Sequence, residues 1–123
     1  LLGAADLGLV ASGTATVEGA LLGTPMVVVY RVSPVSYLLG RRFVKVLHYA
    51  MANLIAGRRV VPELIQGGFT AQTVEREALA LLADPSRALR MRRDLAEVRC
   101  RLGGGGASER AAVIVRRFLA GAV

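Results

Sequence analysis

The segment from Met26 to Val32 constrains the fold more than any other feature, because it is apolar for most of its length and rich in β-branched residues. Such a run is typical of a strand buried inside a sheet. A shorter apolar run, Leu7–Ala11, precedes it, and the segment Ala15–Leu22 between them has a helical pattern that ends at a glycine and a proline. A strand, a helix and a strand with short connections predict a parallel α/β sheet.

The rest of the chain is predicted to be mainly helical. Ser33 and Pro34 are a good start for a second helix that runs to about Val44, so residues 1–45 are expected to form a β-α-β-α unit and residues 46–123 mainly helices. The helices expected in that second part are a short one near Pro62–Gln66 and three longer ones at Thr70–Ala83, Ser86–Leu102 and Ser108–Ala120. In the last of them, Ala111, Val115 and Phe118 are expected to face inward.

Charge and residue counts exclude several classes of protein. The net charge is +7, and residues 87–123 carry nine Arg against three acidic residues. Aromatic residues are only 5% of the chain, which argues against the stacking platforms of a nucleic-acid binder and favours an anionic lipid surface or plain solubility. Cys100 and His48 are each the one residue of their kind, which excludes a disulfide framework and a multi-His or Cys-based metal site.

The run from Ser12 to Glu18 is the first candidate site, because it joins the end of a predicted strand to the start of a helix. Ligands bind at this position in open α/β sheets, and the N–H groups and dipole of a helix start suit a phosphate. Gly13 lets the backbone approach such a group, while the Ser12 and Thr14 hydroxyls add donors. Glu18 lies one turn beyond Thr14 and could accept from ribose hydroxyls; an ordinary capped helix with a solvated Glu fits the spacing equally well.

The run from Asn53 to Arg59 is the second candidate. It mixes an amide, a glycine and two cations in a loop-like pattern. The Asn53 amide can donate to and accept from sugar hydroxyls or phosphate oxygens. Spacing alone favours a simpler interpretation, in which Asn53 occupies a turn and the Arg residues lie on the surface.

Together these motifs resemble the lipid-A-disaccharide synthase family of GT-B glycosyltransferases. The resemblance runs in order through Ala11–Glu18, Pro25–Arg31, Asn53–Gln66 and Gly106–Ala112. The first motif is shared loosely with other GT-B enzymes, whereas the Asn53–Gln66 run is far more specific. The implied fold is α/β: the Rossmann-like C-terminal part of a GT-B enzyme, with parallel strands followed by a helical tail.

The resemblance also implies an activity. The family transfers 2,3-diacylglucosamine from UDP to 2,3-diacylglucosamine 1-phosphate (lipid X), with inversion and without a metal or other cofactor, and releases UDP and the β-1,6 lipid A disaccharide. Carried over by position, Ser12, Gly13 and Thr14 would hold the UDP diphosphate and Glu18 the ribose. Asn53 would lie in the catalytic cleft, in a role that the resemblance leaves open.

The family's enzymes are about three times as long as this chain, so residues 1–123 are expected to be part of the C-terminal, UDP-sugar-binding domain, without the N-terminal domain and inactive alone. The enzyme is expected in the cytoplasm of a Gram-negative bacterium, attached peripherally to the anionic lipid of the inner membrane. It is not expected to bind nucleic acid, and a homodimer is possible. Two alternatives remain: another GT-B UDP-sugar enzyme, and a non-catalytic basic module that binds membranes or polyanions.

Overall fold

A three-stranded parallel sheet forms the centre of the molecule. The computed structural model describes residues 2–33 and 48–121. The strands lie in the order β1-β2-β3, and their bounds are Gly8–Ala11, Met26–Tyr30 and Glu63–Ile65. Both neighbouring pairs are parallel, with Gly8 opposite Met26 and Val28 opposite Glu63. The predicted parallel α/β sheet is therefore confirmed.

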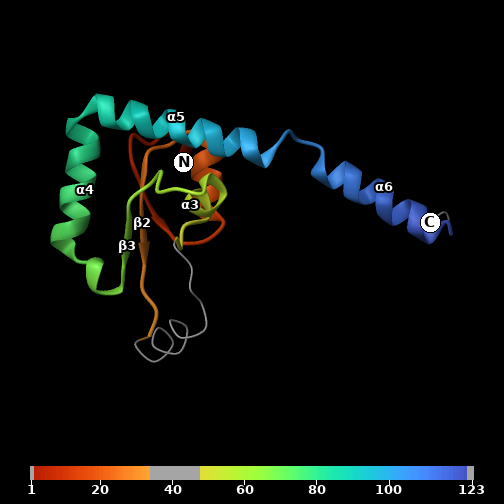
Figure 1. Ribbon diagram of the computed structural model, residues 1–123, viewed down its shortest axis with the longest axis horizontal. Helices are drawn as coiled ribbons and strands as arrows, with labels where there is room; N and C mark the ends of the chain where they lie inside the picture. The colour runs from red at the N-terminus through yellow and green to blue at the C-terminus, as the bar shows by residue number, and fades with distance from the viewer. Residues whose placement is uncertain (1, 34–47, 122–123) are drawn as a thin grey trace.

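Helices surround this sheet on both sides and across one end (Figure 1). Figure 1 shows α4 on one side of the strands, α3 on the other, and α5 crossing the end at which the strands begin. The helical bounds are Leu2–Ala4 for the 3₁₀ helix η1, Ala15–Leu22 for α1, Met51–Ala56 for α3, Gln66–Gly68 for the 3₁₀ helix η2, Ala71–Ala83 for α4, Pro85–Leu102 for α5 and Ala107–Leu119 for α6. The helix expected from Ser33–Pro34 to Val44 lies outside the described residues.

The core lies where α5 packs on the sheet. Met26 and Val28 of β2 have no exposed surface, and neither does Leu95 of α5. The backbone N–H of Met26 donates to the sulfur of Met91 at 3.3 Å, which brings the start of β2 against the middle of α5. Met91, Leu95 and Val98 of this helix are therefore buried, as their helical spacing predicts, whereas Leu102 at its end is 41% exposed.

Two local predictions were wrong. The segment near Pro62–Gln66 is largely strand β3, because the Val28 N–H donates to the Pro62 carbonyl at 2.9 Å and the following residues continue the ladder beside β2. Pairing with the neighbouring strand here outweighs a local preference for helix. The run that begins at Asn53 is not a loop, since Asn53 lies inside α3 and only the residues from Gly57 onward leave the helix.

Helix α6 differs from the others because it projects away from the sheet (Figure 1). Ala111, Val115 and Phe118 were expected to face inward, yet every one of them is exposed, and 70% of Phe118 is accessible. The amphipathic pattern correctly predicts a helix, but nothing in the described chain covers its apolar face. The helix also begins earlier than the start at Ser108 that the sequence predicts, since its N-cap residue is Gly106.

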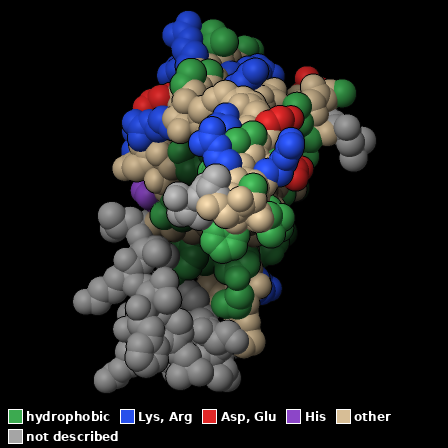
Figure 2. Space-filling model, turned by 90° about the vertical axis from the view of Figure 1, so that its right-hand side faces the viewer, with side chains coloured by type: hydrophobic (Ala, Val, Ile, Leu, Met, Phe, Trp, Pro, Cys, Tyr) green, Lys and Arg blue, Asp and Glu red, His purple; other side chains and the backbone are tan. Residues whose placement is uncertain are grey.

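The surface of the helical part is strongly basic. Figure 2 shows Arg side chains gathered over the upper part of the face on the α6 side, with hydrophobic side chains exposed between and below them. Within residues 2–33 and 48–121, no helix is both long and apolar enough to cross a bilayer.

Candidate functional site

The glycine turn, which we define as Ser12–Thr14, connects the carboxyl end of β1 to α1. Gly13 has a φ of +143°, a conformation that side-chain-bearing residues rarely adopt. A Cβ added at Gly13 would meet no atom within 4 Å, so open space rather than close packing surrounds it. The glycine is therefore required by the sharp change of backbone direction, and the turn faces a region that a ligand can enter.

Two hydroxyl groups hold this turn in place. Thr16, which has no exposed surface, donates its hydroxyl proton to the Gly13 carbonyl at 2.8 Å. Ser12 donates its hydroxyl proton to the Tyr49 carbonyl, also at 2.8 Å. The Ser12 hydroxyl proton is thus already donated to a protein acceptor. The contact made by Thr16 was not predicted from the sequence.

The donors that remain free point to an anion. Among the described residues, the backbone N–H groups of Gly13, Thr14 and Ala15 have no protein acceptor, and the Thr14 hydroxyl makes no capping bond. Unpaired N–H groups at the start of a helix carry the positive end of its dipole. The turn therefore offers several adjacent donors to a negatively charged group such as a diphosphate.

Glu18 belongs to the same surface. It lies in the first turn of α1, is exposed, and its backbone N–H donates to the Thr14 carbonyl at 3.1 Å. No hydrogen bond or ion pair to the described part of the chain occupies its carboxylate. The carboxylate is therefore available to accept from a hydroxyl-bearing ligand placed over the turn. The structure brings all four predicted UDP-contact residues together in one continuous segment.

Asn53 is placed quite differently, because its side chain is completely buried. Its amide nitrogen donates to the Val61 carbonyl at 2.9 Å and to a Glu63 carboxylate oxygen at 2.6 Å. Its amide oxygen accepts from the backbone N–H groups of Val60 and Val61 at 2.7 and 2.9 Å. A primary amide has two donor hydrogens and two acceptor lone pairs, so every hydrogen-bonding position of Asn53 is used within the protein.

Glu63 completes what we call the Asn53–Glu63 cluster, meaning these two side chains and the backbone groups they bind. The Glu63 carboxylate accepts from the backbone N–H groups of Tyr49 and Ala50, both at 3.0 Å, as well as from Asn53. It therefore caps the N-terminus of α3, where Ala50 cannot provide a side-chain cap. An acidic residue in a strand next to apolar neighbours is the signal that could have identified Glu63 from the sequence.

Tyr49 links the cluster to the glycine turn. Its N–H is held by Glu63, and its carbonyl accepts the Ser12 hydroxyl proton. A chain of hydrogen bonds thus runs from β3 through the start of α3 to the end of β1. Because β1 and β3 are both paired with β2, this chain ties the turn to the sheet at a second point.

Arg58, the first of the two basic residues that follow Asn53, has structural partners on α5. Arg58 bonds to Asp94 and Glu97 of α5, both at 2.8 Å, and Arg101 bonds to Glu97 at 2.6 Å. Hydrogen bonds from Arg58 and Arg101 lower the pKa of Glu97, and bonds to Asp94 and Glu97 raise that of Arg58. These contacts fasten the end of α3 to α5.

The other candidate groups gain no catalytic partner. His48 and Glu63 both line a pocket of about 350 Å³ beside the cluster, but Glu63 is occupied by the contacts above. Cys100 is exposed on α5. In the chain outside positions 1, 34–47 and 122–123, no group of three His, Cys, Asp or Glu side chains could hold a metal ion.

Comparison with known proteins gives a consistent result. The family model for lipid-A-disaccharide synthetase matches residues 1–118. A lipid-A-disaccharide synthase of Acidobacterium capsulatum is 60% identical over 81% of the chain, and that of Solibacter usitatus is 50% identical over 96%. The enzyme of the same name from Syntrophus aciditrophicus is 49% identical over 90%. The chain spans only 25%, 31% and 29% of these three relatives, respectively.

Proposed function

The chain belongs to the lipid-A-disaccharide synthetase family, and from that premise we propose that it forms part of the UDP-sugar-binding domain of a glycosyltransferase of lipid A biosynthesis. The complete enzyme would transfer 2,3-diacylglucosamine from its UDP donor to lipid X, and release UDP and the β-1,6 disaccharide. The similar proteins named above are lipid-A-disaccharide synthases, which supports this activity. The family match also favours it over the two alternatives, another GT-B enzyme and a non-catalytic basic module.

The glycine turn is the observation that carries the proposal. Its unpaired N–H groups at the start of α1 suit the UDP diphosphate, and Gly13 leaves the space above them open. Glu18, exposed one turn later, would accept from the ribose hydroxyls. These donors are fixed before the ligand arrives, which reduces the reorganisation that binding and charge development at the leaving UDP would otherwise require.

Asn53 would act on this site as a positioning residue. Its four hydrogen bonds keep the segment that leads into β3 in place, and through Glu63 and Tyr49 they support the carbonyl that holds Ser12. We therefore propose that Asn53 fixes the wall of the catalytic cleft rather than touching the reacting atoms. Acid–base chemistry would come from the part of the enzyme outside this chain, together with the acceptor site.

We further propose that the enzyme lies on the cytoplasmic surface of the inner membrane. The exposed Arg residues of α5 would face anionic lipid, the surface on which both acylated substrates are presented. A homodimer stays a prediction that light scattering of the purified enzyme tests.

A direct assay tests the transferase. The complete enzyme, incubated with UDP-2,3-diacylglucosamine and lipid X, should give a disaccharide spot on thin-layer chromatography, whereas the isolated 123-residue chain should give none. Two domains must enclose the reacting atoms and exclude water before transfer can occur. Turnover by the isolated chain would contradict the proposed division of labour, and an inactive complete enzyme would contradict the activity itself.

Nucleotide competition separates the transferase from a basic module without catalysis. UDP should displace the donor and ADP should not. A module that binds polyanions would show no preference between the two nucleotides, and its binding would weaken steeply with salt.

A further inference from the structure

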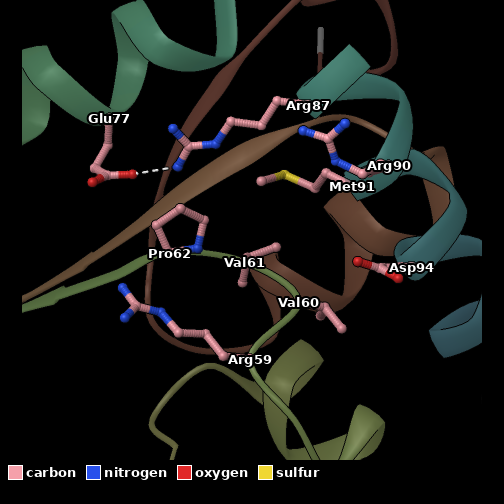
Figure 3. Close-up of a pocket in the computed structure, with 9 residues that line it drawn as sticks. All are labelled: Arg59, Val60, Val61, Pro62, Glu77, Arg87, Arg90, Met91 and Asp94. Carbon is pink, nitrogen blue, oxygen red and sulfur yellow. Dashed lines mark hydrogen bonds and ion pairs between the residues drawn. The ribbon is translucent and has the colours of Figure 1, made fainter. Parts of the chain in front are cut away.

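An arginine-lined pocket lies at the end of the sheet opposite the glycine turn. It occupies about 400 Å³ between α5 and the segment that leads into β3, a volume within the range of small-molecule sites. Figure 3 shows Arg87 and Arg90 extending from α5 on one side, Arg59 on the other, and Val61 and Pro62 between them. None of the residues that line this pocket belongs to the proposed UDP site at the glycine turn.

The floor of this pocket is apolar. Val61 is 1% exposed and Met91 is 6% exposed, and both belong to the core. Polar groups are therefore confined to the walls. A ligand that fits such a site has a charged head and carbon atoms beside it, because the floor offers no hydrogen-bonding partner.

The charges of the walls are not balanced. Glu77 is occupied by Arg87 at 2.6 Å, and Asp94 is occupied from outside the pocket by Arg58 at 2.8 Å. In the part of the chain that the structure describes, Arg59 forms no ion pair.

Arg90 is only weakly compensated. Its guanidinium lies 3.8 Å from an oxygen of Asp84, beyond hydrogen-bonding distance, and its one side-chain hydrogen bond to the described part of the chain goes to the Ser86 hydroxyl at 3.0 Å. Asp84 itself is engaged in capping α5, where it accepts from the N–H groups of Ser86 and Arg87. Two guanidinium groups, those of Arg59 and Arg90, thus line the pocket without a bonded carboxylate among residues 2–33 and 48–121.

We propose that this pocket binds a phosphate group, either the head group of an anionic phospholipid or a free phosphate ester. Guanidinium groups present paired donors that match phosphate oxygens, and those of Arg59 and Arg90 belong to opposite walls of the pocket. Arg87 contributes its remaining N–H groups while Glu77 fixes its orientation. The apolar floor accommodates the carbon atoms of a glycerol or a similar backbone.

A double variant tests this site in the complete enzyme. Arg59→Gln with Arg90→Gln removes the two cations that have no bonded carboxylate in the described chain, and the matched control, Arg116→Gln with Arg117→Gln, removes the same charge from exposed positions of α6 that do not line the pocket. Two ligands are used with saturating UDP present: glycerol 3-phosphate by calorimetry, and phosphatidylglycerol vesicles against phosphatidylcholine vesicles by co-sedimentation. Thermal melting shows that each variant is folded.

The pocket variant should bind the phosphate ligand on the order of tenfold more weakly, as expected for the loss of charge-assisted hydrogen bonds. The control should stay within about twofold of the wild type. A loss with glycerol 3-phosphate identifies a free ester as a ligand, and a loss with vesicles alone identifies the lipid head group. Equal losses in both double variants, or a wild type that binds neither probe, would overturn the proposal.

UDP affinity serves as an independent readout, because the pocket and the glycine turn lie at opposite ends of the sheet. It should be the same in both double variants as in the wild type. The two proposals can therefore be contradicted separately. If the pocket variant binds both UDP and the phosphate ligands as the wild type does, only the proposed phosphate site is ruled out.

Discussion

The glycine turn and the Asn53–Glu63 cluster lie close together but differ in the exposure and hydrogen bonding of their polar groups. In the turn, the N–H groups of Gly13 and Thr14 lack an acceptor within the described residues, and Glu18 is exposed. In the cluster, Asn53 has no exposed surface and uses every donor and acceptor of its amide. Unsatisfied groups are available to a ligand, whereas satisfied and buried groups determine where the backbone lies. The contrast separates residues that are available to contact a ligand from residues that hold the backbone of the site in position.

The largest effect is expected for Asn53→Ala. The substitution leaves the N–H groups of Val60 and Val61 without their acceptor, and it removes two donors, one each from the Val61 carbonyl and from Glu63. Several buried groups left unpaired should lower the free energy of unfolding by about 3–5 kcal/mol. Urea unfolding followed by circular dichroism measures this loss. The family resemblance implies only that Asn53 lies in the catalytic cleft, and it does not predict this structural role.

Thr14→Ala is the reference for that experiment, because Thr14 is exposed and its hydroxyl makes no capping bond. It should leave the unfolding midpoint within experimental error. If Asn53→Ala proves equally silent in unfolding while turnover drops, Asn53 contacts the substrate and belongs with the glycine turn.

A smaller loss is expected for Glu63→Gln. The carboxylate accepts three hydrogen bonds, from the N–H groups of Tyr49 and Ala50 and from the amide of Asn53. A glutamine amide of the same shape has one oxygen and turns an NH₂ group toward at least one of these donors. Stability should fall by about 2–3 kcal/mol, a loss of charged hydrogen bonds at the start of α3. Glu75→Gln on the surface of α4 is the control and should have no measurable effect.

Local patterns predicted the glycine turn well because everything that defines it is local. A strand, a glycine and a helix start are contiguous in sequence, so their order alone places Gly13 and Glu18 at the edge of the sheet. Helices α1, α4 and α5 follow from the same kind of pattern, and their observed bounds agree with it to within a residue.

Contacts between distant segments explain what the sequence could not predict. Strand β3 forms through pairing with β2, more than thirty residues earlier, and the burial of Asn53 depends on that strand. Helix α6 shows the reverse: its amphipathic pattern resembles that of α5, yet Phe118 is exposed while Leu95 is buried. A pattern predicts that one face is apolar, but only tertiary structure determines what covers that face.

On the ligand side of the contrast, Glu18→Ala should weaken UDP binding without affecting stability. The side chain is exposed and forms no hydrogen bond or ion pair within the described chain, so the free energy of unfolding should be unchanged. Loss of charge-assisted bonds to a pair of hydroxyls should cost about 1.5–3 kcal/mol of binding free energy. Calorimetry with UDP measures it, and Glu109→Ala on α6 controls for the change in charge. Equal UDP affinity in wild type and variant would remove Glu18 from the site.

The smallest effect is expected for Ser12→Ala, and it decides on which side of the contrast Ser12 belongs. Sequence reasoning places Ser12 on the diphosphate, whereas in the structure its hydroxyl proton goes to the Tyr49 carbonyl at 2.8 Å. Removing that bond should lower stability by about 1 kcal/mol, and UDP affinity should fall only slightly, as the turn loses one of its two hydroxyl supports.

Thr14→Val removes a hydroxyl that has no partner in the described chain, so it should show the opposite pattern: unchanged unfolding and weaker UDP binding. The two variants, compared by thermal melting and calorimetry, thus separate a residue that supports the turn from one that faces the ligand. A Ser12→Ala enzyme with wild-type stability and a large loss of UDP affinity would show that the hydroxyl leaves Tyr49 for the phosphate when the nucleotide binds.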